Sequence, residues 1–142
     1  MEPTVQVAII SASASIIVAS VTFYLNKRAE RKDALQQRKL EHYNRLLSAL
    51  SDLAVDDVDK NGANLRFSKA VNTIVLVAPQ YVITALMNYH DEVKFSNKNR
   101  TTEGHDKKLI ELLLSIRKSL DLPFKDEKES FNFHLIGAKP TK

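Results

Sequence analysis

The sequence predicts an all-α protein in which an N-terminal transmembrane helix continues into a small cytoplasmic bundle of about four helices. Residues 3–26 carry no charge, only three glycines and four prolines occur in 142 residues, and apolar residues then recur at helical spacing. Four segments are expected: a transmembrane signal anchor over 1–26, a basic juxtamembrane helix over 27–39, a cytoplasmic helical bundle over 40–122 and a C-terminal tail over 123–142.

The first element is the apolar stretch Val5–Leu25, which consists mostly of Val, Ile, Ala, Ser, Phe and Leu. Such a stretch rises about 31 Å as an α-helix, enough to cross a hydrocarbon core of about 30 Å. A cleaved signal peptide and a buried soluble helix are the alternatives. A signal peptide carries its basic residues before the apolar core, whereas here they follow it. The positive-inside rule then places residues 26–142 in the cytoplasm and the N-terminus outside a bacterial inner membrane.

Small side chains recur at three- and four-residue spacing inside this stretch and therefore share one helix face: Ala8, Ser11, Ser15, Ala19 and Thr22. Faces of this kind let membrane helices approach closely, so self-association into a homo-oligomer is a hypothesis for this segment. Small residues are also common in solitary membrane helices.

The next element is basic. Residues 26–39 hold six basic and two acidic side chains, whereas the whole chain has a net charge of +4. The basic side chains nearest the apolar stretch are candidates for contact with lipid headgroups: Lys27, Arg28, Arg31 and Lys32. A topology signal on a solvated helix face explains the same residues. Because the basic residues are concentrated here, no nucleic-acid partner is expected.

Apolar stripes and turn signals divide the remaining chain into helices. The first helix continues from the anchor and carries the stripe Leu40, Tyr43, Leu47, Leu50 and Ala54, followed by a turn over Asp56, Asp57, Asp59, Asn61 and Gly62. A second helix over about 63–77 would bury Phe67, Ala70, Val71, Ile74 and Val77.

Pro79 separates the second helix from a third over about 80–94, because proline suits the first turn of a helix. The third helix would bury Val82, Ala85, Leu86, Tyr89 and Val93. After a polar loop over 96–104, a fourth helix over about 105–120 would bury Leu109, Leu113, Ile116 and Leu120, with Ile110, Leu112 and Leu114 widening its apolar face. Four such stripes joined by short loops favour a helical bundle.

Two segments leave alternatives open. Residues 70–89 lack charge and could form a second membrane span, although their polar residues favour a pair of core helices. The tail alternates Phe131, Phe133 and Leu135 like a strand, before Gly137 and Pro140. It could pack on the bundle or serve as a linear motif for a partner.

Recognisable enzyme and cofactor motifs are missing from the sequence. The lack of cysteine excludes disulfides and thiolate metal sites, and three scattered glycines cannot form a phosphate-binding loop. None of the four histidines, His42, His90, His105 and His134, has another at metal-ligand helical spacing. The aspartates between 56 and 59 fit no EF-hand. We therefore expect no catalytic residues, no cofactor and no metal.

The layout resembles a loose set of small bacterial membrane proteins with an N-terminal signal anchor and a helical cytoplasmic domain. The resemblance is carried by the charged helix Arg28–Tyr43, the block Phe67–Tyr89 and the segment Ile116–Leu122. It implies a bacterial or phage source and an inner-membrane location, and it implies no activity.

The features together favour a membrane-anchored interaction or regulatory module that binds an unidentified cytoplasmic protein. Arg117 and Lys118, beside an apolar helix face, are candidate contact residues, although a solvated face explains them too. One alternative is a membrane-perturbing effector, such as a phage lysis or exclusion protein or a defence toxin, that assembles through its transmembrane helix. A tethered enzyme is a third and weaker hypothesis.

Overall fold

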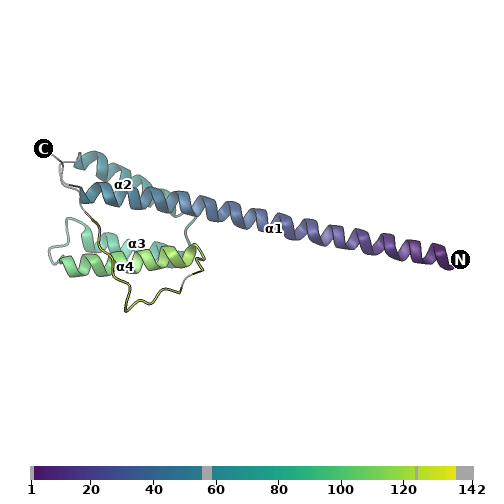
Figure 1. Cartoon of the computed structure of the whole chain (residues 1–142). Helices are drawn as coiled ribbons and strands as arrows, with labels where there is room; N and C mark the ends of the chain where they lie inside the picture. Colours follow the sequence, from purple (N-terminus) through teal and green to yellow (C-terminus); the bar gives the residue numbers. More distant parts are fainter. Residues whose placement is uncertain (1, 56–58, 124, 137–142) are drawn as a thin grey trace. The chain divides into compact units, whose positions relative to one another are not determined.

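The computed structural model describes residues 2–55, 59–123 and 125–136, which contain four α-helices and no strand (Figure 1). The helices are α1 (Pro3–Ala54), α2 (Lys60–Ile74), α3 (Gln80–Val93) and α4 (Thr102–Ser119). The chain divides into two compact units, Met1–Gln37 and Arg38–Lys142, with the boundary inside α1. The predicted all-helical class and the long apolar N-terminal helix are confirmed.

The first unit consists of the N-terminal part of α1. Side chains from residue 5 to residue 25 are all exposed, including the large apolar ones. Its serine hydroxyls are satisfied within the helix, because several donate to the carbonyl oxygen four residues earlier at 2.8–2.9 Å: Ser13, Ser15 and Ser20. These serines therefore add no unsatisfied hydroxyl to an apolar surface.

The second unit is a helical bundle around one core. Each helix contributes an apolar stripe, and α3 and α4 lie side by side as the most closely packed pair (Figure 1). The largest fully buried side chains come from all four helices: Tyr43, Leu46, Leu50, Ile74, Val82, Leu86, Leu109 and Leu112. Hydrophobic burial of such stripes is the main term that stabilises a bundle of this size.

Polar caps set where the helices begin. Asp59 caps α2 by accepting a hydrogen bond from the Asn61 backbone nitrogen at 3.1 Å, so α2 starts before the predicted residue 63. Thr101 caps α4 through a 2.9 Å hydrogen bond from the Gly104 nitrogen, so the prediction of a loop reaching Gly104 was wrong. Asp56 and Asp57, the other aspartates of the predicted turn, lie outside the described residues.

Most of the predicted core positions are buried, and the errors lie inside α1 and at the ends of α2 and α4. Leu40 is 42 % exposed, because α1 first becomes fully covered one turn later at Tyr43. Val77 lies beyond α2, which ends at Ile74 in a tight turn, and it is half-buried. Four buried positions were missed: Leu46, Ala49, Ala63 and Ser119.

The structure does not form the single continuous helix that a second membrane span over 70–89 would need. The chain leaves the helical conformation between Ile74 and Gln80, and the flanking helices bury their apolar faces in the bundle core. Among the described helices, only α1 is long and apolar enough to cross a membrane.

The described part of the tail follows the bundle surface without regular secondary structure. Phe131 and Leu135 pack against the core, whereas Phe133 is 39 % and Ile136 85 % exposed. The strand-like alternation predicted from the sequence is therefore wrong: Phe131 and Leu135, four residues apart, contact the bundle, and Phe133 between them is exposed. Phe124, Gly137 and Pro140 lie outside the described residues.

We predict that Leu112→Ala lowers the free energy of unfolding of the bundle by about 2–5 kcal/mol, because it opens a cavity in a packed core. Leu112 is fully buried, whereas Leu65 on α2 is 55 % exposed and provides a matched control. Leu65→Ala should change the stability by less than about 0.5 kcal/mol. Urea unfolding followed by circular dichroism measures both, and equal effects would contradict the assigned core.

Candidate functional site: a histidine-lined pocket on the bundle

An open pocket of about 940 Å³ lies between α1, α2, α3, α4 and the tail, all within the second unit. Its volume is in the range of small-molecule sites, about 300–1,000 Å³. The apolar part of its lining includes Leu50, Leu53, Phe67, Val93 and Leu135. Three of the four histidines also line it: His90, His105 and His134. These histidines come from α3, α4 and the tail, so only the folded bundle brings them together.

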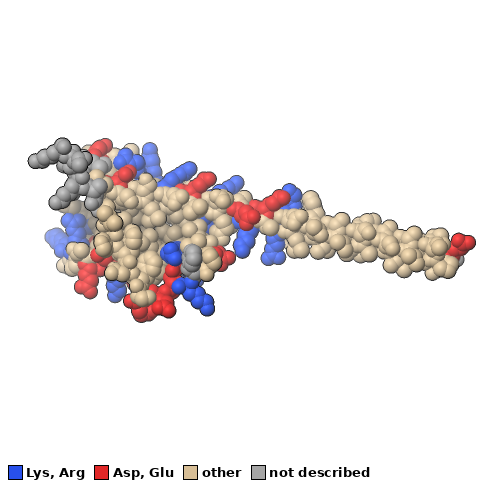
Figure 2. Space-filling view, in the orientation of Figure 1, with Lys and Arg blue, Asp and Glu red and all other residues tan. Residues whose placement is uncertain are grey.

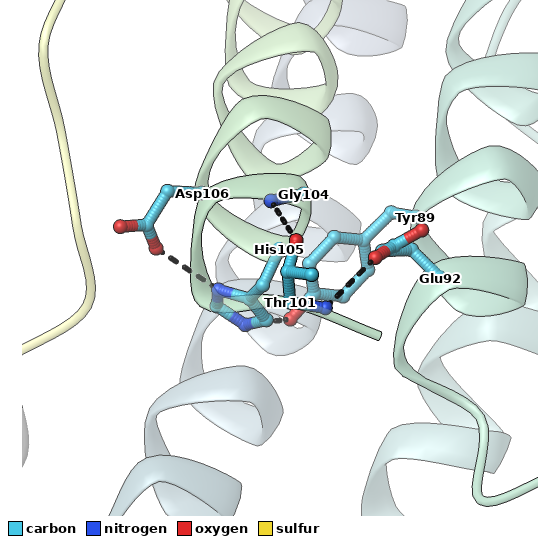
Figure 3. Close-up of polar contacts among 6 residues, drawn as sticks. All are labelled: Tyr89, Glu92, Thr101, Gly104, His105 and Asp106. Carbon is cyan, nitrogen blue, oxygen red and sulfur yellow. Dashed lines mark hydrogen bonds and ion pairs between the residues drawn. The ribbon is translucent and has the colours of Figure 1, made fainter. Parts of the chain in front are cut away.

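His105 is held between two partners at the pocket (Figure 3). Its Nδ1 lies 3.0 Å from Asp106 Oδ1 and its Nε2 lies 3.1 Å from the Tyr89 hydroxyl. A carboxylate can only accept, so the neutral ring carries its proton on Nδ1 and accepts from Tyr89 at Nε2. The Tyr89 and His105 rings also meet edge to face, with centroids 5.5 Å apart. The ring orientation of His105 is thus fixed on both sides.

Glu92, from α3, contacts the start of α4 (Figure 3). Glu92 Oε1 accepts a long, 3.5 Å hydrogen bond from the Thr101 nitrogen, and a carboxylate is favoured at a helix N-terminus. A Cβ atom on Gly104 would lie 2.5 Å from the same oxygen. Glycine at this position therefore lets the carboxylate approach the first turn of α4, beside His105.

Two basic side chains also line the pocket, and they differ in their pairing. Lys94 Nζ lies 2.9 Å from Asp91 Oδ1. Arg100 has its guanidinium carbon 6.0 Å from the centre of the Phe95 ring. Within the described ranges no carboxylate lies at ion-pair distance from Arg100. Asp106 is the one carboxylate of the described lining, and it faces His105.

The pocket brings together hydrogen-bonding and basic side chains. Among the described residues, no group of three His, Asp or Glu side chains is arranged to hold a metal ion. This includes the neighbouring residues His90, Asp91 and Glu92 on α3. The order Tyr89–His105–Asp106 resembles a relay for activating a hydroxyl. Burial, followed by the negative charge of Asp106, raises the pKa of Tyr89 to about 12. The Tyr89 hydroxyl therefore keeps its proton at neutral pH.

The residues proposed for self-association all lie on the first part of α1. Successive helical residues turn by about 100°, so the five small side chains occupy one face: Ala8, Ser11, Ser15, Ala19 and Thr22. The Ser15 hydroxyl already donates to the Ser11 carbonyl at 2.9 Å. Close approach on this face would thus depend on small size rather than on donation from Ser15.

The residues proposed for lipid headgroups are exposed on α1: Lys27, Arg28, Arg31 and Lys32. Lys27 pairs with Glu30 at 2.8 Å and lies 5.8 Å from the Phe23 ring. In Figure 2 the charged side chains of α1 follow a long stretch that has none. This abrupt change from apolar to charged surface is the feature that any function of the first unit has to use.

The two residues proposed for partner contact have different surroundings. Arg117 donates two hydrogen bonds to Asp126 at 2.8 and 2.9 Å, and its guanidinium carbon lies 5.7 Å from the Phe131 ring. These hydrogen bonds lower the pKa of Asp126. Lys118 is exposed, with its Nζ 5.2 Å from the Tyr81 ring. Arg117 therefore binds the tail, while Lys118 faces solvent.

Sequence reasoning missed the pocket. His90, His105 and His134 are far apart in the chain, and no local spacing signals that they meet. No protein-family model matches this chain, and comparisons with curated proteins and with solved structures found no similar protein. The resemblance to small bacterial single-pass membrane proteins therefore stays a prediction.

We predict that the bundle loses stability as the pH rises from about 10 to about 12. The folded state holds the Tyr89 proton up to a pKa of about 12, whereas the unfolded chain releases it near 10. The free energy of unfolding should therefore fall by up to about 2–3 kcal/mol across this window. Urea unfolding at each pH measures the effect.

The control for this prediction is Tyr89→Phe, which keeps the ring and every lysine. It should lose the Tyr89 share of the pH dependence, and at neutral pH it should cost about 1 kcal/mol because His105 loses a hydrogen bond. Burial also raises the pKa of Tyr43, so part of the dependence remains in the variant. Parallel curves for the two proteins would contradict the prediction.

Proposed function

We propose that this protein is a membrane-anchored interaction or regulatory module of the bacterial inner membrane. The N-terminal part of α1 spans the bilayer once, the N-terminus lies outside, and residues 26–142 are cytoplasmic. The bundle binds a protein partner and performs no catalysis. The observation that carries this proposal is the exposed apolar surface of α1 over residues 5–25, followed directly by basic residues.

The exposed surface is the strongest support for a membrane. Many large apolar side chains on this part of α1 are more than half exposed, among them Ile10, Ile16, Val18 and Phe23. Soluble proteins rarely expose a contiguous apolar surface of this extent. Such a surface therefore marks a site that binds a membrane or another protein. A helix of this length satisfies its own backbone hydrogen bonds, which a lipid environment requires.

The basic residues support the proposed orientation and a role for membrane lipid. Lys and Arg beside a span are retained on the cytoplasmic side, and each can gain on the order of 1 kcal/mol near an anionic leaflet. The small bacterial membrane proteins that this chain resembles also carry a charged helix after the anchor, and in this chain that helix is Arg28–Tyr43.

The test is the topology of the full chain. Reporters active only in the cytoplasm or only in the periplasm are fused separately after Lys142, and the fusion is fractionated after alkaline extraction. We expect cytoplasmic activity, membrane retention and an uncleaved chain. A periplasmic reporter overturns the orientation, a shortened chain indicates a cleaved signal peptide, and a soluble full-length fusion overturns the anchor.

We predict that neutralising the basic residues beside the apolar stretch weakens this orientation. Replacing Lys27, Arg28, Arg31 and Lys32 with Gln should give a mixture of both topologies. The matched control replaces four exposed basic residues of the bundle with Gln: Arg45, Lys69, Lys98 and Lys107. If the control disturbs topology as strongly as the first set, total charge rather than its position determines orientation.

The second candidate function is a membrane-perturbing effector that assembles through the small-residue face of α1. The one-sided placement of these residues favours it. If it is correct, overexpression should depolarise or arrest cells, and Ser15→Leu with Ala19→Leu should abolish that effect by separating the helices.

The control for assembly is Ser13→Leu with Ser20→Leu, because these serines lie on the opposite side of the helix at about 100° per residue. This pair should leave toxicity unchanged. Full toxicity of the Ser15/Ala19 variant rules out assembly through that face, and a wild-type chain that does not affect cells rules out the effector function.

A further inference from the structure

The histidine-lined pocket combines an apolar interior with an excess of positive and protonatable groups. Leu50, Leu53 and Phe67 lie on the apolar side, from α1 and α2. The polar side is formed by the α3–α4 loop, the start of α4 and the tail. A ligand that matches both sides needs an apolar body and an anionic group.

Arg100 is the side chain best placed to anchor an anion. Lys94 forms an ion pair with Asp91, and Asp106 accepts a hydrogen bond from His105. Arg100, in contrast, has no ion pair with any described carboxylate. Two described carboxylates line a cavity together with Arg100. Asp106 lines the histidine-lined pocket, and Glu92 lines a smaller neighbouring cavity. A guanidinium presents paired N–H donors in the geometry of a carboxylate, which makes arginine a good carboxylate anchor.

The histidines add hydrogen-bonding groups beside this cation. His105 is oriented by Tyr89 and Asp106, and His90 and His134 are exposed at the pocket. The rings of His90 and His134 can donate to a carboxylate oxygen from a ring N–H. Aromatic side chains in the lining also offer faces for a flat apolar group.

We propose that this pocket binds a small amphipathic carboxylate, with the carboxylate at Arg100 and the apolar body against Leu53, Phe67 and Leu135. This inference goes beyond the proposed anchoring and does not depend on it, because every residue involved belongs to the bundle.

The experiment uses the full chain in lipid nanodiscs, with empty nanodiscs as the blank for partitioning. Three probes of similar shape are titrated by calorimetry at neutral pH: 4-phenylbutyrate, 4-phenylbutanamide and 4-phenylbutylamine. We expect the carboxylate to bind at least about tenfold more tightly than the amide, in line with a charge-assisted hydrogen bond. The amine should not bind measurably.

The decisive variant is Arg100→Gln, with Lys98→Gln as the control from the same loop, because Lys98 is exposed and does not line the pocket. Arg100→Gln should weaken 4-phenylbutyrate binding about tenfold, and Lys98→Gln less than about twofold. Ser68→Trp should also abolish binding, because it fills the pocket from an exposed position on α2. Circular dichroism confirms that each variant folds.

Three results overturn the proposal. Equal affinity for the acid and the amide shows that the pocket does not recognise the anion. Equal losses in Arg100→Gln and Lys98→Gln show that binding follows overall charge. No binding to the wild-type chain at millimolar probe excludes this ligand class. None of these results bears on topology, so the anchoring proposal is tested separately.

Discussion

Burial of Tyr43, Leu46 and Leu50 on α1 is the interaction on which the rest of the bundle depends. Each side chain is at most 2 % exposed, and all three belong to the core that α2, α3 and α4 share. The Tyr43 hydroxyl must also find a partner, because an unpaired buried hydroxyl costs about 1–3 kcal/mol. Ser119 supplies that partner at 2.7 Å and so joins the end of α4 to α1. Without this part of α1, the other helices would expose their apolar faces to water. The helix that carries the apolar N-terminal stretch is therefore also a structural helix of the bundle.

Sequence reasoning recovered the four helices because each has an apolar stripe and the breaks between them contain Pro79 or polar turns. It failed where a single polar side chain decides a boundary. Gly104 suggests a loop, yet it lies in the first turn of α4, because Thr101 caps the helix and Glu92 occupies the space that a Cβ would fill. Ser119 is polar and was not assigned to the core, and only the position of the Tyr43 hydroxyl explains its burial. Such errors arise because helical periodicity reports the face of a helix and not the groups that meet it from elsewhere.

The pocket shows the same limit more strongly. Its histidines meet only because α3 and α4 pack side by side and because the tail returns over the bundle. The tail is held at the surface by Arg117 with Asp126, by Lys128 Nζ at 3.7 Å from Glu111, and by Phe131 against the core. None of these contacts is visible from local spacing. The residue proposed from sequence for partner contact, Arg117, instead holds the tail, and it thereby helps to keep His134 and Leu135 at the pocket.

This arrangement couples the pocket to the bundle surface. The tail is attached by the bidentate ion pair of Arg117 with Asp126, whose side chains are partly exposed, and by the apolar contacts of Phe131 and Leu135 with the core. A ligand that packs on Leu135 adds apolar contact to the attached tail and to no other state. It would therefore favour attachment by its differential affinity for that state. Linkage requires the reverse as well: a partner that displaces the tail from Arg117 and from the core would weaken the ligand to the same extent. For the interaction module that we propose, this reciprocity is a physical route by which a small molecule controls the binding of a protein.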